Sequence, residues 1–141
     1  MTLPGAPFLY YGDEIGMNDA SELPDRDAVR TPMQWEPGEG AGFSTSAQTR
    51  RPIVGGIGIS VEEQLADDSS ILHRVRSLIQ QRKAHPELGT APFEAVETGH
   101  AGVLGFQRGE LLCLHNFTEE AVDLGPVELG PFGYAWLPVE A

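Results

Sequence analysis

The chain has 141 residues, 40% of them hydrophobic, which is an ordinary length and composition for a globular domain that buries a core. Its 9 basic and 21 acidic residues give a formal net charge of −12, which argues against nucleic acid and membrane as partners because both attract positively charged surfaces. A neutral polar ligand such as a sugar fits this charge better.

The chain opens on an apolar run, residues 3–11, that leads into a glycine and two carboxylates, Asp13 and Glu14. The lack of alternation over residues 7–11 predicts a strand covered on both faces. Such a strand needs neighbouring strands and none precedes it, so we expect the chain to be the C-terminal part of a larger protein. The run is too short to span a membrane and no basic residue precedes it, so we expect a cytoplasmic protein.

Residues 12–58 show no sustained periodicity and are rich in Gly, Pro, Ser, Asp and Glu. This composition predicts a long irregular loop, with one short helical turn near residues 20–23. Loops of this length in a compact domain usually carry function.

Apolar residues recur at helical spacing from Ile71 to Ile79 and predict a helix. Residues 67–70 supply N-cap candidates, and Pro86 blocks extension beyond a basic last turn that complements the helix dipole. This is the clearest helix in the sequence.

After Gly89 the chain changes to short apolar runs separated by Gly or Pro turns, which predicts a small antiparallel β-sandwich. Residues 108–110 join two of these runs and predict a hairpin. Cys113, the only cysteine, lies in one run and predicts a buried thiol with no disulfide partner. The expected strands are residues 93–97, 103–107, 111–117, 121–124 and 134–139.

Two sequence blocks carry a resemblance to a known family: GDEIGM at residues 12–17, and RTPMQW at residues 30–35 followed by AGFS at residues 41–44. In this order they resemble the end of the catalytic barrel in the α-amylase superfamily, glycoside hydrolase family 13. Within it they are most similar to the branch of trehalose synthases, α-glucosidases and oligo-1,6-glucosidases. The resemblance continues through residues 61–65 and 82–88 and then becomes diffuse.

The resemblance implies a fold of class α/β plus all-β. Residues 1–88 would supply the last strand, the long βα loop and the last helix of a (β/α)8 TIM barrel. Residues 89–141 would form a C-terminal β-sandwich domain. The family's three catalytic carboxylates belong to earlier barrel strands, so the resemblance implies no catalytic residue in this chain.

Asp13 and Glu14 invite comparison with the paired carboxylates of a glycosidase. A retaining enzyme needs two carboxyl groups about 5–5.5 Å apart on opposite sides of one glycosidic bond. Adjacent residues project in divergent directions, so these two do not form that pair. Each remains a candidate for orienting another group or for binding a sugar hydroxyl.

Arg30, Asp27 and Trp35 are the other candidate substrate-binding residues. A guanidinium can bind sugar hydroxyls, but Arg30 can equally pair with Asp25 or Asp27. The resemblance favours sugar contact, because the matching loop borders the pocket in the glucosidase and trehalose synthase branch. Trp35, like Phe43, offers a ring for a sugar's C–H surface or an anchor for the loop.

The four histidines are scattered, and the acidic runs lack the alternating ligands of a calcium loop, so we expect no metal and no cofactor. The leading hypothesis is that the whole enzyme acts on maltose-like α-glucosides, such as maltose or trehalose, with retention. This chain alone would be inactive. Two alternatives stay open: a non-catalytic sugar-binding module, and a subunit that completes a barrel begun by an upstream chain.

Overall fold

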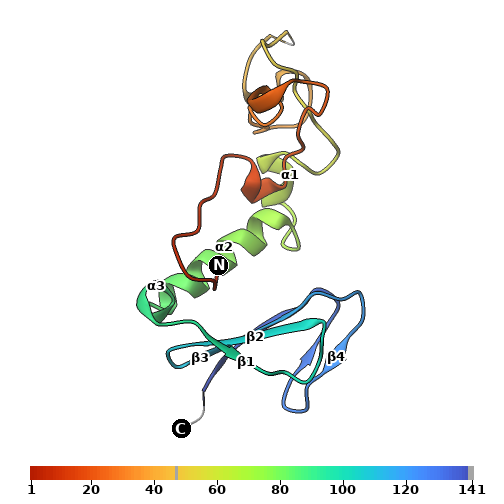
Figure 1. Ribbon diagram of the computed structural model, residues 1–141. Coiled ribbons are helices and arrows are strands. Elements are labelled where there is room, and N and C mark those ends of the chain that lie inside the picture. The colour runs from red at the N-terminus through yellow and green to blue at the C-terminus, as the bar shows by residue number, and fades with distance from the viewer. Residues whose placement is uncertain (47, 140–141) are drawn as a thin grey trace. The chain divides into compact units, whose positions relative to one another are not determined.

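The computed structural model describes residues 1–46 and 48–139 and divides into two compact units (Figure 1). The first, here called the loop unit, is Phe8–Gln80. The second, the sheet unit, combines Met1–Pro7 with Gln81–Ala141. In the described part of the chain, no helix is both long enough and apolar enough to cross a membrane.

Residues 7–11 do not form the buried strand that their composition predicts. They pair with no other strand of the described residues, and Phe8 is 93% exposed. Tyr10 and Tyr11 are exposed as well, although a strand covered on both faces would bury them. The physical reason is that a doubly covered strand is defined by hydrogen bonds to neighbouring strands, and the described residues place no strand beside this segment.

The loop unit is mostly irregular, as predicted, but it contains short helical pieces. The expected turn near residues 20–23 is a single turn, closed by a 2.9 Å hydrogen bond from the Leu23 amide to the Ala20 carbonyl. Ser60 starts an unpredicted helix with a capping box, in which its hydroxyl accepts from the Glu63 amide and the Glu63 carboxylate accepts from the Ser60 amide. The pieces are η1 (Asp13–Ile15), η2 (Asp25–Asp27), η3 (Glu39–Gly42) and α1 (Val61–Leu65).

A small apolar cluster and one buried amide hold the loop unit together. Ile15, Met33 and Leu72 form the cluster. Beside it, Gln64 Nε2 donates to the carbonyls of Ile15 (2.7 Å) and Gly58 (3.1 Å), and Gln64 Oε1 accepts from the Leu72 amide at 3.0 Å. Since buried polar groups must be paired, this one side chain fixes three chain segments relative to each other.

The predicted helix is confirmed as α2 (Ile71–Ala84). Ser70 precedes it and accepts a hydrogen bond from the His73 amide, in the manner of an N-cap. A short helix that the sequence did not predict, α3 (Glu87–Thr90), follows at once.

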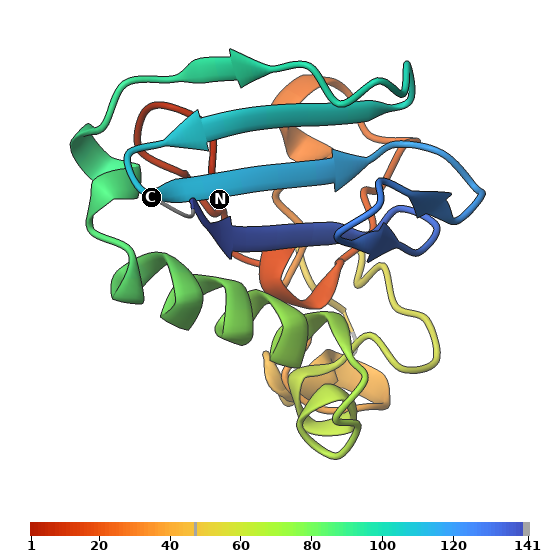
Figure 2. The same ribbon diagram turned by 90° about the horizontal axis from the view of Figure 1, so that it is seen from below.

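The sheet unit contains a four-stranded antiparallel sheet in the order β1-β2-β3-β6 and a two-stranded ribbon of β4 and β5 (Figures 1 and 2). The hairpin between β2 and β3 is confirmed: Arg108 pairs with Leu111, and Gly109 adopts the positive φ of 63° that the tight turn requires. All five expected strands are present, and β5 is additional. The strands are β1 (Glu94–Val96), β2 (Val103–Arg108), β3 (Leu111–Asn116), β4 (Val122–Asp123), β5 (Glu128–Leu129) and β6 (Tyr134–Pro138).

The two faces of the large sheet carry separate cores. On one face Phe106 and Cys113 pack with Leu88 and Leu111. The other face packs against residues of the ribbon: Val103, Leu114, Val122 and Leu129 form its buried centre. Cys113 is fully buried, so the prediction of a buried thiol is confirmed, and this burial raises the pKa of the thiol to about 11.

Two arginines of the sheet unit form hydrogen bonds with backbone carbonyls of the first residues of the chain. Arg108, only 1% exposed, donates to the carbonyls of Thr2 (2.6 Å), Leu88 (2.9 Å) and Ala91 (3.1 Å). Arg82 donates to the carbonyls of Met1, Gly5 and Leu88. Backbone carbonyls thus satisfy a buried guanidinium that has no carboxylate partner among the described residues.

Candidate functional site

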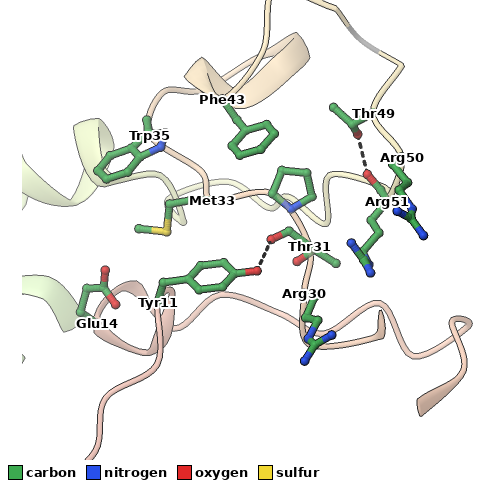
Figure 3. Close-up of a pocket in the computed structure, with 11 residues that line it drawn as sticks. Tyr11, Glu14, Arg30, Thr31, Met33, Trp35, Phe43, Thr49, Arg50 and Arg51 are labelled. Carbon is green, nitrogen blue, oxygen red and sulfur yellow. Dashed lines mark hydrogen bonds between the residues drawn. The ribbon is translucent and has the colours of Figure 1, made fainter. Parts of the chain in front are cut away.

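A pocket of about 440 Å³ lies entirely within the loop unit (Figure 3). Its wall combines apolar and aromatic side chains with three guanidinium groups. Figure 3 shows Glu14 and Trp35 at one end of it and the arginines at the other. The lining residues are Tyr11, Glu14, Arg30, Thr31, Pro32, Met33, Trp35, Phe43, Thr49, Arg50 and Arg51.

Most of the RTPMQW block, residues 30–35, forms the floor of this pocket. Pro32 restrains Thr31 to an extended backbone, and the Tyr11 hydroxyl donates to the Thr31 carbonyl at 3.0 Å. At the end of the block, the Trp35 amide donates to the Ala41 carbonyl at 2.9 Å. The block is therefore held from several sides, although it belongs to no helix or strand.

The carboxylates of Asp13 and Glu14 differ in their position relative to the pocket. Asp13 does not line the pocket, because its Oδ2 accepts a 2.8 Å hydrogen bond from the Tyr10 amide and closes a local turn. Glu14 does line it, while Glu14 Oε2 accepts from the Gly12 amide at 2.9 Å. Both acids stabilise the turn after residues 7–11, and only Glu14 is available to a ligand.

Arg30 lines the pocket, but it is not the partner of Asp27. The carboxylate of Asp27 accepts a 2.5 Å hydrogen bond from Arg51 Nη2. This bond from Arg51 holds the pKa of Asp27 below its usual value, and the charges of Arg50 and Arg30 act in the same direction. Within the described residues Arg30 forms no salt bridge, so its guanidinium remains free for a ligand.

Sequence reasoning missed Arg51. It belongs to no recognisable motif and lies 24 residues from its partner Asp27, so no local spacing links the two. The only available signal was the pair of adjacent arginines, Arg50 and Arg51, in a chain that is otherwise strongly acidic.

Trp35 and Phe43 both contribute to the pocket wall and are 50% and 55% exposed. Large exposed rings at a concave surface suit the C–H faces of a sugar ring. The described residues contain no group of three or more His, Cys, Asp or Glu side chains arranged to hold a metal ion.

Known proteins resemble the chain over most of its length. The family described as alpha amylase, catalytic domain, matches residues 1–91. Over 161 residues, the chain is 35% identical to the trehalose synthase/amylase TreS of Mycolicibacterium smegmatis, covering 99% of this chain and 27% of that protein. Over 141 residues, it is 33% identical to a probable alpha-glucosidase of Rhizobium meliloti, covering 86% of this chain and 25% of that protein. It therefore spans about a quarter of the length of these curated relatives.

Among solved structures, the trehalulose synthase MutB of Pseudomonas mesoacidophila MX-45 matches with a TM-score of 0.82. The match covers 99% of this chain and 36% of that chain at 22% identity, and it shows a shared fold. The family match extends over more than half of the sequence and includes both blocks that line the pocket. The chain is a member of the α-amylase family, as the GDEIGM and RTPMQW blocks predict.

Proposed function

We propose that this chain supplies one wall of the sugar pocket in an enzyme of the trehalose synthase and α-glucosidase branch, acting on maltose-like α-glucosides with retention. The observation that supports this most directly is the pocket itself. The RTPMQW block builds it from Arg30, Trp35 and their neighbours, and two exposed rings flank the floor. Active sites on barrel folds are built from such βα loops.

The same proposal accounts for the irregular start of the chain. In a (β/α)8 barrel, residues 7–11 would be the last strand, the loop unit the following βα loop, and α2 the last helix, within residues 1–88. Residues 89–141 would be the trailing sandwich domain. The exposure of Phe8 is what such a strand shows when its neighbours are missing.

Within the proposal, the chemistry is divided between this chain and the rest of the enzyme. Asp13 and Glu14 each accept a hydrogen bond from a backbone amide and stabilise a turn, which does not suit a nucleophile or a proton donor. The catalytic carboxylates would come from outside the chain. This chain would bind the sugar through Arg30 and Glu14, stack on it through Trp35, and exclude water from one side.

A chimera tests the proposal. The segment of M. smegmatis TreS that aligns with this chain is replaced by the chain, and maltose and trehalose are followed by chromatography. We expect interconversion or hydrolysis of these sugars, a reduced rate in the Arg30→Ala chimera, and no turnover by the isolated chain. A chimera that melts cooperatively but turns over neither sugar would overturn the proposal.

The exposed segment at residues 7–11 also supports the complementing-subunit hypothesis. Here TreS truncated before the aligned segment is co-expressed with this chain. Recovery of activity, together with co-purification of the two chains, is the expected result for a subunit that completes a barrel. Sugar binding by the chain without any recovery would favour the non-catalytic binding module instead.

A further inference from the structure

We infer that one end of the pocket binds a phosphate group carried by the sugar, so that the preferred ligand is a phosphorylated α-glucoside. This inference rests on the proposed function and names the class of sugar that its pocket favours. It starts from a contrast of charge. The whole chain carries a formal net charge of −12, yet three of its 9 basic residues, Arg30, Arg50 and Arg51, line this one pocket.

The three guanidinium groups form one cluster. Figure 3 shows them on the same side of the pocket, away from Glu14. All three act on one carboxylate, that of Asp27. The hydrogen bond from Arg51 contributes most to lowering the pKa of Asp27, and the charges of Arg51, Arg50 and Arg30 act in the same direction. Since the effect of a charge weakens with distance, the three groups lie around the same carboxylate.

This arginine cluster carries more positive charge than the described residues balance. Asp27 pairs with Arg51, and in the described part of the chain no salt bridge involves Arg30 or Arg50. Both of these residues are exposed, and Glu14, the one acidic residue among those that line the pocket, lies at the other end. Two positive charges are therefore left unbalanced. Like charges held together repel, so binding of an anion would stabilise the cluster.

Two unbalanced charges suit a phosphate monoester. At pH 7 such a group carries a charge of about −1.5 to −2 and offers three strong acceptor oxygens. The planar guanidinium group donates two parallel hydrogen bonds to phosphate oxygens, and these charge-assisted bonds are stronger than bonds between neutral groups. A carboxylate would balance only one of the two charges.

The rest of the pocket suits the sugar that carries this phosphate. The exposed rings of Trp35 and Phe43 offer faces on which a sugar ring can stack. The carboxylate of Glu14 can accept a hydrogen bond from a sugar hydroxyl but repels a phosphate. The opposite charges at the two ends thus give the ligand one orientation, with its sugar toward Glu14 and its phosphate at the arginine cluster.

The test compares trehalose 6-phosphate with trehalose in calorimetric titrations of the full chain at low and at moderate salt. We expect trehalose 6-phosphate to bind about tenfold more tightly, because charge-assisted hydrogen bonds are added, and we expect added salt to reduce this ratio of affinities. Arg30→Gln and Arg50→Gln should each lower the ratio, because each removes one charge from the cluster. Arg76→Gln, at an exposed position of α2 outside the pocket, is the matched control and should keep the wild-type ratio.

Inorganic phosphate is the third ligand, and we expect it to bind more weakly than trehalose 6-phosphate because it lacks the sugar ring. If it binds as tightly, the cluster takes a free anion and the inference is wrong. Equal affinities for the two sugars, binding of neither, or a ratio that both glutamine variants keep would also overturn it. None of these results decides the proposed function, because the chimera reports turnover of the neutral sugars maltose and trehalose.

Discussion

The loop unit and the sheet unit satisfy their backbone hydrogen bonds in different ways. In the sheet unit, strands pair in register over long stretches, and two apolar clusters pack against opposite faces of one sheet. In the loop unit, isolated turns, one capping box and the side-chain amide of Gln64 satisfy the backbone groups, around a small apolar cluster of Ile15, Met33 and Leu72. The hydrogen bonds of the loop unit therefore depend on individual side chains, whereas those of the sheet unit depend on strand pairing.

The difference explains where the pocket is found. A paired strand has little freedom to present backbone and side chains to a ligand, whereas an irregular segment can place groups from distant positions around one cavity. All the residues that line the pocket come from the loop unit. Because hydrogen bonds there depend on individual side chains such as Gln64, local opening is expected to be easier.

The largest expected effect concerns the core of the sheet unit. Phe106→Ala should lower the free energy of unfolding by about 3–5 kcal/mol, because it empties a fully buried site. Phe8→Ala removes the same side chain from an exposed position of the loop unit and should cost little. Urea denaturation measures both, and comparable losses for the two variants would show that residues 7–11 are buried in solution.

The next effect concerns the buried guanidinium of Arg108. Arg108→Met keeps much of the volume but leaves the carbonyls of Thr2 and Ala91 without this donor and removes one of the two donors to the Leu88 carbonyl, so we expect a loss of about 2–3 kcal/mol. Arg76→Met, at an exposed position of α2, is the control and should change stability only slightly. Hydrogen exchange should also speed up in the segment around Thr2, and unchanged protection there would contradict the role assigned to Arg108.

Gln64→Leu gives the corresponding measurement in the loop unit. The Leu72 amide and the carbonyls of Ile15 and Gly58 would lose their partner, with an expected cost of about 1.5 kcal/mol. Alkylation of Cys113 should stay slow in this variant, because burial raises the pKa of that thiol to about 11 and the sheet unit is not altered. Gln80→Leu is the exposed control. Fast alkylation in Gln64→Leu would mean that the two units open together.

The smallest effect is the pH dependence of the Asp27–Arg51 pair. The hydrogen bond from Arg51 lowers the pKa of Asp27 in the folded chain. The pair therefore stabilises the fold above the ordinary carboxyl pKa, and this contribution disappears as the pH falls through the lowered value. NMR titration of the Asp27 carboxyl should show that low midpoint in the wild type and an ordinary one in Arg51→Gln. If Asp27 titrates with the same midpoint in both proteins, the ion pair with Arg51 is not formed in solution.

Sequence reasoning succeeded where the determinants are local. Helix α2 followed from spacing and from Pro86, and the strands of the sheet unit from apolar runs and turns. The binding of sugar by Arg30 and Trp35, which the resemblance implies, stays a prediction. Sequence reasoning failed where the partner is remote or absent. Arg51 pairs across 24 residues, and a strand at residues 7–11 requires neighbours that the described residues do not supply.

The discontinuity of the sheet unit has a consequence for the order of folding. Thr2 lies 106 residues from Arg108 and 113 from His115, whose Nε2 is 3.0 Å from the Thr2 hydroxyl. Contacts this distant in sequence pay the largest loop-closure entropy and form slowly. During synthesis, residues 1–7 cannot make these contacts until β2 and β3 have emerged, so the two parts of the sheet unit join only after the whole loop unit has been made.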